Sequence, residues 1–146
     1  MYEYRCEIVR IIDGDTAVVD IDLGFGVWMK GEKIRFMGID TPESRTSDKE
    51  EKVFGLYAKE YVKKHIPERS IQVLKTFKDE TGKFGRILGD FIIEDTTLIT
   101  KMIDEGIGAP YHGQSKSDIE VIHLNNRERL IAEGHVIPYG TTPQSD

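Results

Sequence analysis

The stretch CEIVRIIDGDTAVVDID, residues 6–22, constrains the fold more than any other part of the chain. It consists of two runs rich in β-branched residues that are joined by Asp13-Gly14, a dipeptide typical of tight hairpin turns because it accepts positive φ angles. We therefore predict strands over about 4–13 and 15–22. The fold should begin with an antiparallel hairpin.

The segments after this hairpin predict further strands and one helix. LGFGVWMKGE, residues 23–32, is interpreted as a glycine-marked connection, and a third strand is predicted over about 33–39. A helix is predicted over roughly 50–65, because Ser47 and Glu50 have capping-box spacing and apolar residues follow at helical intervals. Gly55 within this helix costs about 1 kcal/mol relative to alanine.

The second half of the chain predicts two more strands and two more helices. The strands cover about 70–77 and 85–93 and flank a glycine-containing turn. TTLITKMIDEG, residues 96–106, predicts a short helix that ends at Gly106. A last helix is predicted after a second capping box, formed by Ser117 and Glu120, and ends at Gly134. The predicted class is α+β, with a five-stranded OB-fold barrel and about three helices. We expect a single domain over 1–138 and a flexible tail over 139–146.

Composition excludes several classes of protein. With 146 residues, 38% hydrophobic and 32% charged, the chain is predicted to form one domain with a genuine core. It contains no run of eighteen apolar residues and no visible signal segment, so a cytoplasmic protein that does not span a membrane is expected. Cys6 is the only cysteine, which excludes an internal disulfide and a multi-cysteine zinc site.

The net charge of −6 and the pI near 5.3 argue against a protein that coats nucleic acids by bulk electrostatics. Any phosphate-binding site must therefore be a local basic patch. An acidic balance also leaves room for carboxylates that hold a metal cation.

IRFMGIDTPESR, residues 34–45, begins with apolar residues typical of a strand. Arg35 lies among these apolar residues, and the polar segment Asp40-Thr41-Pro42-Glu43 follows them directly. Arg35 and Arg86 carry planar guanidinium groups suited to bidentate phosphate contacts. Hard cations such as Ca²⁺ prefer oxygen ligands. Two strand ends offer such oxygens, on Asp13, Asp15, Asp40, Glu43 and the carbonyl of Thr41. A cation, a base and positive groups together are what phosphodiester hydrolysis requires.

Each of these residues also has a simpler interpretation when taken alone. Asp13 and Asp15 suit a turn, Arg35 could lie along the sheet face, and Arg86 could pair with a surface carboxylate. His112 and His123 are isolated and are interpreted as structural or surface residues. Only the combination of the motifs favours a functional site.

Three segments, IIDGDTAVVDI, IRFMGIDTPE and KFGR, together resemble the thermonuclease, or staphylococcal nuclease-like, family. They occur in the family's order and at similar separations, and the resemblance extends over about residues 5–110. It implies that Asp15, Asp40 and the Thr41 carbonyl bind Ca²⁺. It also implies that Glu43 acts as the general base on the attacking water, or orients it.

The resemblance further implies that Arg35 and Arg86 grip the phosphate and stabilise the five-coordinate transition state. The 5′ oxygen leaves, which gives 3′-phosphate products from both DNA and RNA, and a monomer is expected. Lys83, Phe84 and Tyr111 are the implied substrate-binding residues. Phe84 stands where the family commonly has tyrosine, and Tyr111 is followed by His112 in place of a second aromatic residue.

Two other functions remain open from the sequence. A catalytically silent domain of the same fold could bind nucleic acid or protein, as OB folds often do. A small-anion binding domain without a polymer substrate is also compatible with the acidic composition.

Overall fold

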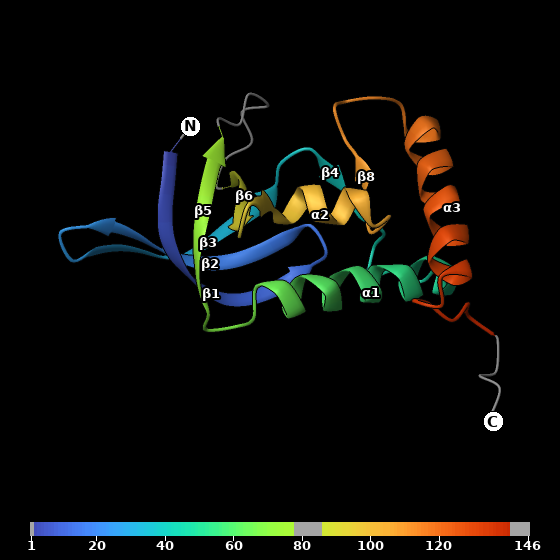
Figure 1. Cartoon of the computed structure of the whole chain (residues 1–146), viewed down its shortest axis with the longest axis horizontal. Coiled ribbons are helices and arrows are strands. Elements are labelled where there is room, and N and C mark those ends of the chain that lie inside the picture. Colours follow the sequence, from blue (N-terminus) through green and yellow to red (C-terminus); the bar gives the residue numbers. More distant parts are fainter. Residues whose placement is uncertain (1, 78–85, 141–146) are drawn as a thin grey trace.

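In the computed structural model, which describes residues 2–77 and 86–140, five strands close into a barrel-like ring (Figure 1). These strands are β1 (Tyr2–Asp13), β2 (Thr16–Gly24), β3 (Val27–Phe36), β5 (Ile71–Phe77) and β6 (Ile87–Ile93). Neighbours pair antiparallel in the order β3-β2-β1-β5-β6, and a parallel pairing of β3 with β6 closes the ring. The predicted α+β class with a five-stranded OB-type barrel is confirmed.

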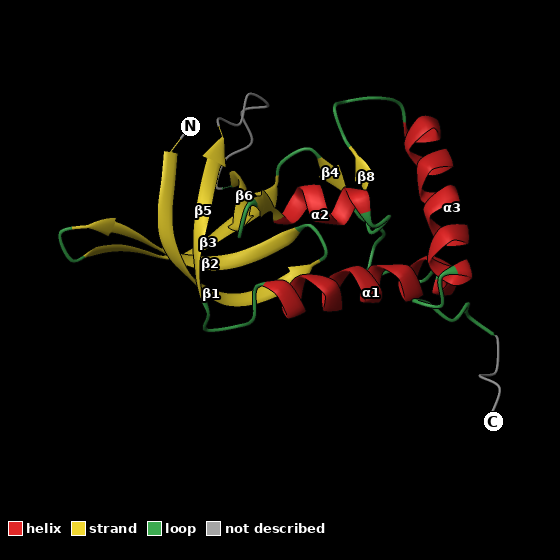
Figure 2. Ribbon diagram, viewed as in Figure 1, coloured by secondary structure: helices red, strands yellow, loops and turns green. Residues whose placement is uncertain are grey.

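Three helices and three short strands complete the described part of the chain. They are α1 (Lys49–His65), α2 (Leu98–Asp104), α3 (Lys116–Ala132), β4 (Ile39–Asp40), β7 (Thr96–Thr97) and β8 (Ala109–Pro110). β4 pairs with β8, and Figure 2 shows this pair and α3 at the end of the molecule opposite the projecting β2–β3 hairpin. No helix in the described ranges has the length and apolar character to cross a membrane.

The core fills the ring and the space beneath α1. Every ring strand contributes fully buried side chains, including Ile8, Val19, Ile34, Leu74 and Phe91. α1 covers the ring with Phe54, Ala58 and Val62. Cys6 belongs to this core, and burial raises the pKa of its thiol to about 12, so the thiol is expected to be unreactive.

The connection predicted over residues 23–32 is mostly strand, so that prediction was wrong. β2 and β3 continue as a two-stranded hairpin beyond the ring (Figure 1). The turn is made by Gly24, Phe25 and Gly26, with φ angles of 85°, 56° and 76°. Gly31 lies within β3 and donates its N–H to the Asp20 carboxylate at 2.8 Å. The glycines therefore mark a turn and a local strand irregularity, and not a long connection.

The predicted capping box of the first helix was also wrong by one residue. Asp48, and not Ser47, is the N-cap of α1, and its carboxylate accepts hydrogen bonds from the N–H groups of Glu50 and Glu51. A carboxylate satisfies the free N–H groups and also lies favourably at the positive end of the helix dipole.

α3 begins two residues earlier than its sequence pattern predicts. Ser115, and not Ser117, is the N-cap, and its hydroxyl accepts a hydrogen bond from the N–H of Asp118. The predicted ends of α2 and α3 are confirmed, because Gly106 and Gly134 follow their C-caps with φ angles of 75° and 79°. The domain limits and the tail stay predictions, and residues 141–146 lie outside the described residues.

Asp90 on β6 is a buried carboxylate that helps to begin α2. Its Oδ1 accepts hydrogen bonds from the N–H groups of Phe91 at 2.8 Å and Ile99 at 3.1 Å. Burial is the largest influence on this group and raises its pKa from the ordinary value of 3.8. The folded protein therefore holds a proton here at a pH where the unfolded chain has lost it.

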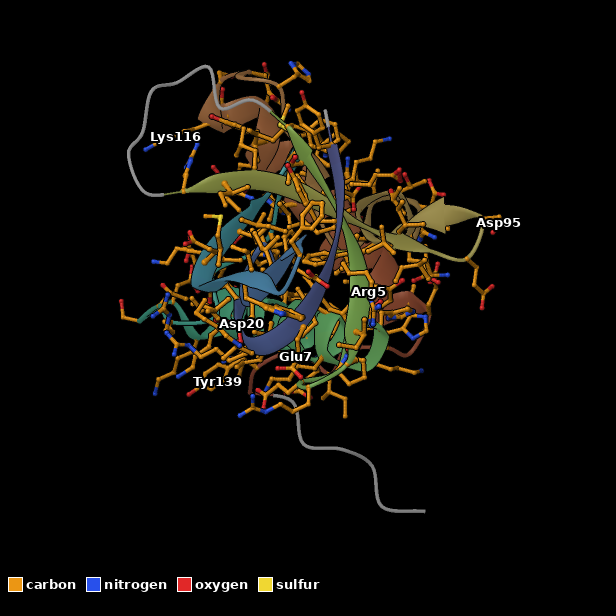
Figure 3. The ribbon with its side chains drawn as sticks, turned by 90° about the vertical axis from the view of Figure 1, so that its left-hand side faces the viewer. Arg5, Glu7, Asp20, Asp95, Lys116 and Tyr139 are labelled. Atoms are coloured by element: carbon orange, nitrogen blue, oxygen red, sulfur yellow. The ribbon has the colours of Figure 1, made fainter. Side chains whose placement is uncertain are left out.

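We expect Asp90→Asn to change the pH dependence of stability. Between pH 3.8 and the raised pKa, the wild-type contribution of Asp90 should decrease as pH rises, because the native state binds more protons there. Asparagine keeps an acceptor oxygen but no charge, so the variant should gain stability relative to wild type across this window. Urea unfolding from pH 3.5 to 7 measures the difference. Asp95→Asn in the neighbouring exposed turn (Figure 3) is the control. The prediction would be contradicted if Asp90→Asn were less stable, relative to wild type, at neutral pH than at pH 3.5.

Candidate functional site

The first part of the site forms where the β1–β2 turn meets the end of β3. Thr16 pairs with Arg35 across the β2–β3 ladder, and the N–H of Phe36 donates to the Asp15 carbonyl at 2.8 Å. The Arg35 guanidinium donates to the Phe36 carbonyl at 2.8 Å and lies 3.6 Å from the Asp15 carboxylate. The strand register therefore brings together an arginine and a carboxylate that are 20 residues apart.

Gly14 is required in this turn for a reason that the sequence did not indicate. Neither Asp13 nor Gly14 has a positive φ angle, so the predicted basis for the Asp13-Gly14 turn was wrong. A Cβ atom at Gly14 would lie 2.7 Å from the Cβ of Ala58 on α1 and 3.1 Å from the Thr41 hydroxyl. Glycine permits α1, the turn and the segment after β4 to approach closely.

The segment after β4 is tied to the end of β1 by Asp13. The Asp13 carboxylate accepts a hydrogen bond from the Ser44 hydroxyl and another from the Arg45 guanidinium at 3.0 Å. Thr41, at the start of this segment, is only 4% exposed. Asp13 therefore holds the segment that carries Glu43, which favours a structural role for Asp13 over a direct one.

Gly55 brings α1 against the same segment. A Cβ atom at Gly55 would lie 2.6 Å from the Ser44 nitrogen and even closer to the Glu43 carbonyl. The glycine that weakens the helix pattern is therefore the point at which helix and segment meet backbone to backbone.

Gly55→Ala should reverse the usual effect of this substitution. Alanine normally stabilises a helix interior by about 1 kcal/mol, but here we expect a loss of about 1–3 kcal/mol, because a backbone segment must move. Glu43 should be displaced with it. Urea unfolding is the measurement, with Lys52→Ala on the exposed face of α1 as the control. An unchanged or higher unfolding free energy for Gly55→Ala would show that the close approach is relaxed without cost.

A groove of about 740 Å³ opens between this segment and α3. Five of the predicted site residues line it, namely Arg35, Asp40, Glu43, Arg86 and Tyr111. Asp15 and Thr41 are not among the lining residues: the Asp15 side chain is 18% exposed and contacts Arg35, and Thr41 is buried. Lys83 and Phe84 lie outside the described residues. The structure therefore gathers residues from two of the three sequence motifs, together with Tyr111, at one groove.

Negative charge is concentrated at one side of this groove. The pKa of Glu43 is raised, first by partial burial and then by repulsion from Asp15, Asp13, Glu51 and Asp40. A raised pKa means that the Glu43 carboxylate takes up a proton more readily than an ordinary glutamate does. The same repulsion would be relieved by a cation among these carboxylates.

The chemistry of the donors fits a hard divalent cation. Asp15 and Asp40 provide carboxylate oxygens, and Thr41 provides a carbonyl, all of which Ca²⁺ prefers. Within residues 2–77 and 86–140, no group of three or more His, Cys, Asp or Glu side chains is arranged to hold a metal. Water and phosphate oxygens would therefore have to supply the remaining ligands.

α3 contributes a wall of the groove that the sequence motifs did not predict. Ile119, His123 and Arg127 line the groove at intervals of four residues, as side chains on one helix face do. The His123 Nε2 lies 2.7 Å from Asp40 Oδ2, so a histidine that is isolated in sequence lies beside a predicted metal ligand. Its spacing from Ile119 was the one available signal, and it indicates a buried face but not what that face contacts.

A family model described as staphylococcal nuclease homologue matches residues 33–130, from β3 into α3. Two thermonucleases are similar to the chain. That of Staphylococcus hyicus is 29% identical over 105 residues, which are 72% of this chain and 58% of that protein. That of Staphylococcus intermedius is 29% identical over 100 residues, 68% of this chain and 55% of that protein.

The endonuclease YhcR of Bacillus subtilis is 28% identical over 115 residues, which are 75% of this chain but 9% of that protein. The match to the thermonucleases spans little more than half of their length. The family match includes Arg35, Asp40, Thr41, Glu43 and Arg86, and it also includes His123.

Proposed function

The chain belongs to the staphylococcal nuclease homologue family, and we propose that it is a Ca²⁺-dependent nuclease that hydrolyses the phosphodiester bonds of DNA and RNA. The observation that carries this proposal is that Arg35, Glu43 and Arg86 line one groove together with Asp40. Two guanidinium groups, a carboxylate with a raised pKa and a metal-binding carboxylate are the groups that phosphodiester hydrolysis requires.

Ca²⁺ bound by Asp15, Asp40 and the Thr41 carbonyl would supply positive charge for the phosphate oxygens and activate the nucleophile. Glu43 accepts a proton from the attacking water at its carboxylate. Arg35 and Arg86 donate N–H groups to the phosphate oxygens, where charge develops in the transition state. The water oxygen bonds to phosphorus as the bond from phosphorus to the 5′ oxygen breaks. The 5′ oxygen takes up a proton from solvent and leaves as a hydroxyl, and the phosphate remains on the 3′ oxygen of the product.

The partners in this proposal are DNA and RNA, with no preference for either sugar, since no proposed contact depends on a 2′-hydroxyl. Tyr111, Lys83 and Phe84 are proposed to bind nucleotides beside the cleaved bond. Stacking of a base on an aromatic side chain tolerates any base, which suits a nuclease without sequence preference. A monomeric, cytoplasmic enzyme stays part of the proposal.

The test is digestion of plasmid DNA, single-stranded DNA and RNA in Ca²⁺, in Mg²⁺ and in EDTA. We expect all three substrates to be cleaved in Ca²⁺, with 3′-phosphate ends, and none in EDTA. Mg²⁺ should support less cleavage, because its small octahedral shell accepts few irregular protein ligands. Full activity in EDTA would exclude the proposed metal requirement.

A catalytically silent domain predicts a different result in the same assay. Such a domain would bind a labelled single strand, with affinity that falls steeply as salt is raised, but would leave it intact in Ca²⁺. A domain that binds only small anions would show no salt-dependent binding of the strand. Fluorescence anisotropy beside the digestion therefore distinguishes the three functions.

A further inference from the structure

His123 makes a contact with Asp40 that the proposed reaction does not use. Its Nε2 lies 2.7 Å from Asp40 Oδ2, although the two residues are 83 positions apart in sequence. The His123 side chain is 13% exposed, whereas the Asp40 side chain is 37% exposed. The imidazole is therefore mostly covered by the protein, the carboxylate is more exposed, and both side chains line the groove.

Packing on both sides of His123 holds the imidazole in place. Ile119 and Leu130, one turn before it and two turns after it, are buried. The Asn126 side-chain amide reaches the Gly108 carbonyl at 3.4 Å, beside the β4–β8 pair. Arg127 lies over the ring of Phe54 on α1, with 5.4 Å between guanidinium and ring centre. α3 is thus fixed both to α1 and to the strand pair that carries Asp40.

Asp40 needs such support because of its neighbours. Its carboxylate lines the groove together with those of Glu43 and Glu51, so like charges lie around it. Repulsion of this kind would turn a mobile carboxylate toward solvent. β4 is only two residues long, so its ladder does little to fix the side chain. A hydrogen bond from a buried imidazole can hold the carboxylate in one orientation.

We propose that His123 is a positioning residue for Ca²⁺ binding, which donates from Nε2 to Asp40 Oδ2 and leaves Oδ1 for the cation. This inference rests on the proposed function, because it assigns Asp40 as a metal ligand. Residues that orient metal ligands in this way commonly contribute about 10- to 100-fold to metal affinity. α3 then belongs to the metal site, although it supplies none of the proposed ligands.

An alternative role for His123, competition with the cation, would have the opposite effect on Ca²⁺ affinity. If His123 competed with the cation for the Asp40 carboxylate, removing the imidazole would tighten Ca²⁺ binding. If His123 positions the carboxylate, removing it must weaken binding. The sign of the change in affinity therefore decides between the two roles.

The experiment is calorimetric titration of the full chain with Ca²⁺ alone, without nucleic acid. We expect His123→Leu to weaken Ca²⁺ binding by at least about tenfold and His123→Gln, which retains a donor, to recover part of the loss. Val121→Ala, on the exposed face of α3, should leave affinity unchanged. If the leucine variant does not fold, His123→Asn, whose amide is too short to reach Asp40, replaces it.

Unchanged or tighter binding in the variants that lose the hydrogen bond would overturn the positioning role and leave the proposed nuclease function intact. If wild type itself bound no Ca²⁺, the metal assignment in the proposed function would fail, and this inference with it. A second measurement, in EDTA, tests the contact itself. The thermal midpoint should fall less in the His123→Leu, Asp40→Asn double variant than the sum of the single losses, whereas additive losses would overturn the contact.

Discussion

Replacing Arg86 or Arg35 by lysine is expected to lower kcat by at least about a hundredfold, because a point charge cannot reproduce two parallel N–H donors to a phosphate. Both guanidinium groups line the groove with Glu43 and Asp40. Lysine retains the positive charge, so the substitution removes the fork geometry and little of the long-range attraction for the nucleic acid. The loss should therefore fall on turnover more than on KM.

The two variants should differ in their need for Ca²⁺. The Arg35 guanidinium also contacts the Asp15 carboxylate at 3.6 Å and the Asp15 carbonyl at 3.5 Å. Arg35→Lys should therefore disturb a proposed metal ligand and raise the Ca²⁺ concentration for half-maximal rate. Arg86, directly before β6, is proposed to bind the phosphate and not the cation, so Arg86→Lys should change that concentration less than Arg35→Lys does.

The measurement is a Ca²⁺ titration of the cleavage rate for each variant, with circular dichroism to confirm that β3 remains folded. Arg69→Lys is the matched control, since Arg69 is exposed and pairs with Glu7 on β1. Near-normal turnover in either groove variant would remove that arginine from the proposed mechanism and return it to an ordinary surface role.

Much of the barrel could be predicted because its signals are local. The runs of β-branched residues that form β1 and β2 are visible in sequence, and so are the glycines after α2 and α3. The hairpin beyond the ring was missed because Gly24, Gly26 and Gly31 suggested a connection. Glycine at a turn or a strand irregularity has the same sequence appearance as glycine in a loop.

The convergence of the site could not be derived from any single motif. Asp15, Arg35 and Arg86 lie in three segments, and only strand pairing between β2, β3 and β6 brings these segments together. Resemblance to a family supplied that information. The need for glycine at positions 14 and 55 could not be predicted either. Gly14 lies close to α1 and Thr41, and Gly55 lies close to the segment after β4, and no local sequence pattern encodes these distances.

His123 was missed for a related physical reason. A helix pattern identifies which face is buried, but it does not identify the strand end on which the helix packs. The contact between α3 and β4 depends on the length of the connection after β8 and on the position of α1. These are properties of the whole fold, so a histidine that appeared isolated in sequence lies beside a predicted metal ligand.

The other large effect is expected at Glu43, and it should differ in kind from the effect at Asp40. Glu43→Gln should lower the maximal rate by about 10² or more, because an amide cannot accept the proton of the attacking water. The Ca²⁺ concentration for half-maximal rate should change little, since Glu43 is not among the proposed ligands. Asp40→Asn should instead raise that concentration, because it removes a ligand charge.

Parallel Ca²⁺ titrations of cleavage rate for the two variants make the comparison, with Glu68→Gln as the control for loss of one exposed carboxylate. The effects of the two variants are not fully independent, because Asp40 lies near enough to Glu43 to raise the pKa of Glu43. Removing either charge must therefore change the repulsion at the other, and a small shift in Ca²⁺ dependence is expected even for Glu43→Gln. If both variants showed the same loss of metal affinity, fully rescued by excess Ca²⁺, Glu43 would be a further ligand, and the base would have to be sought elsewhere in the groove.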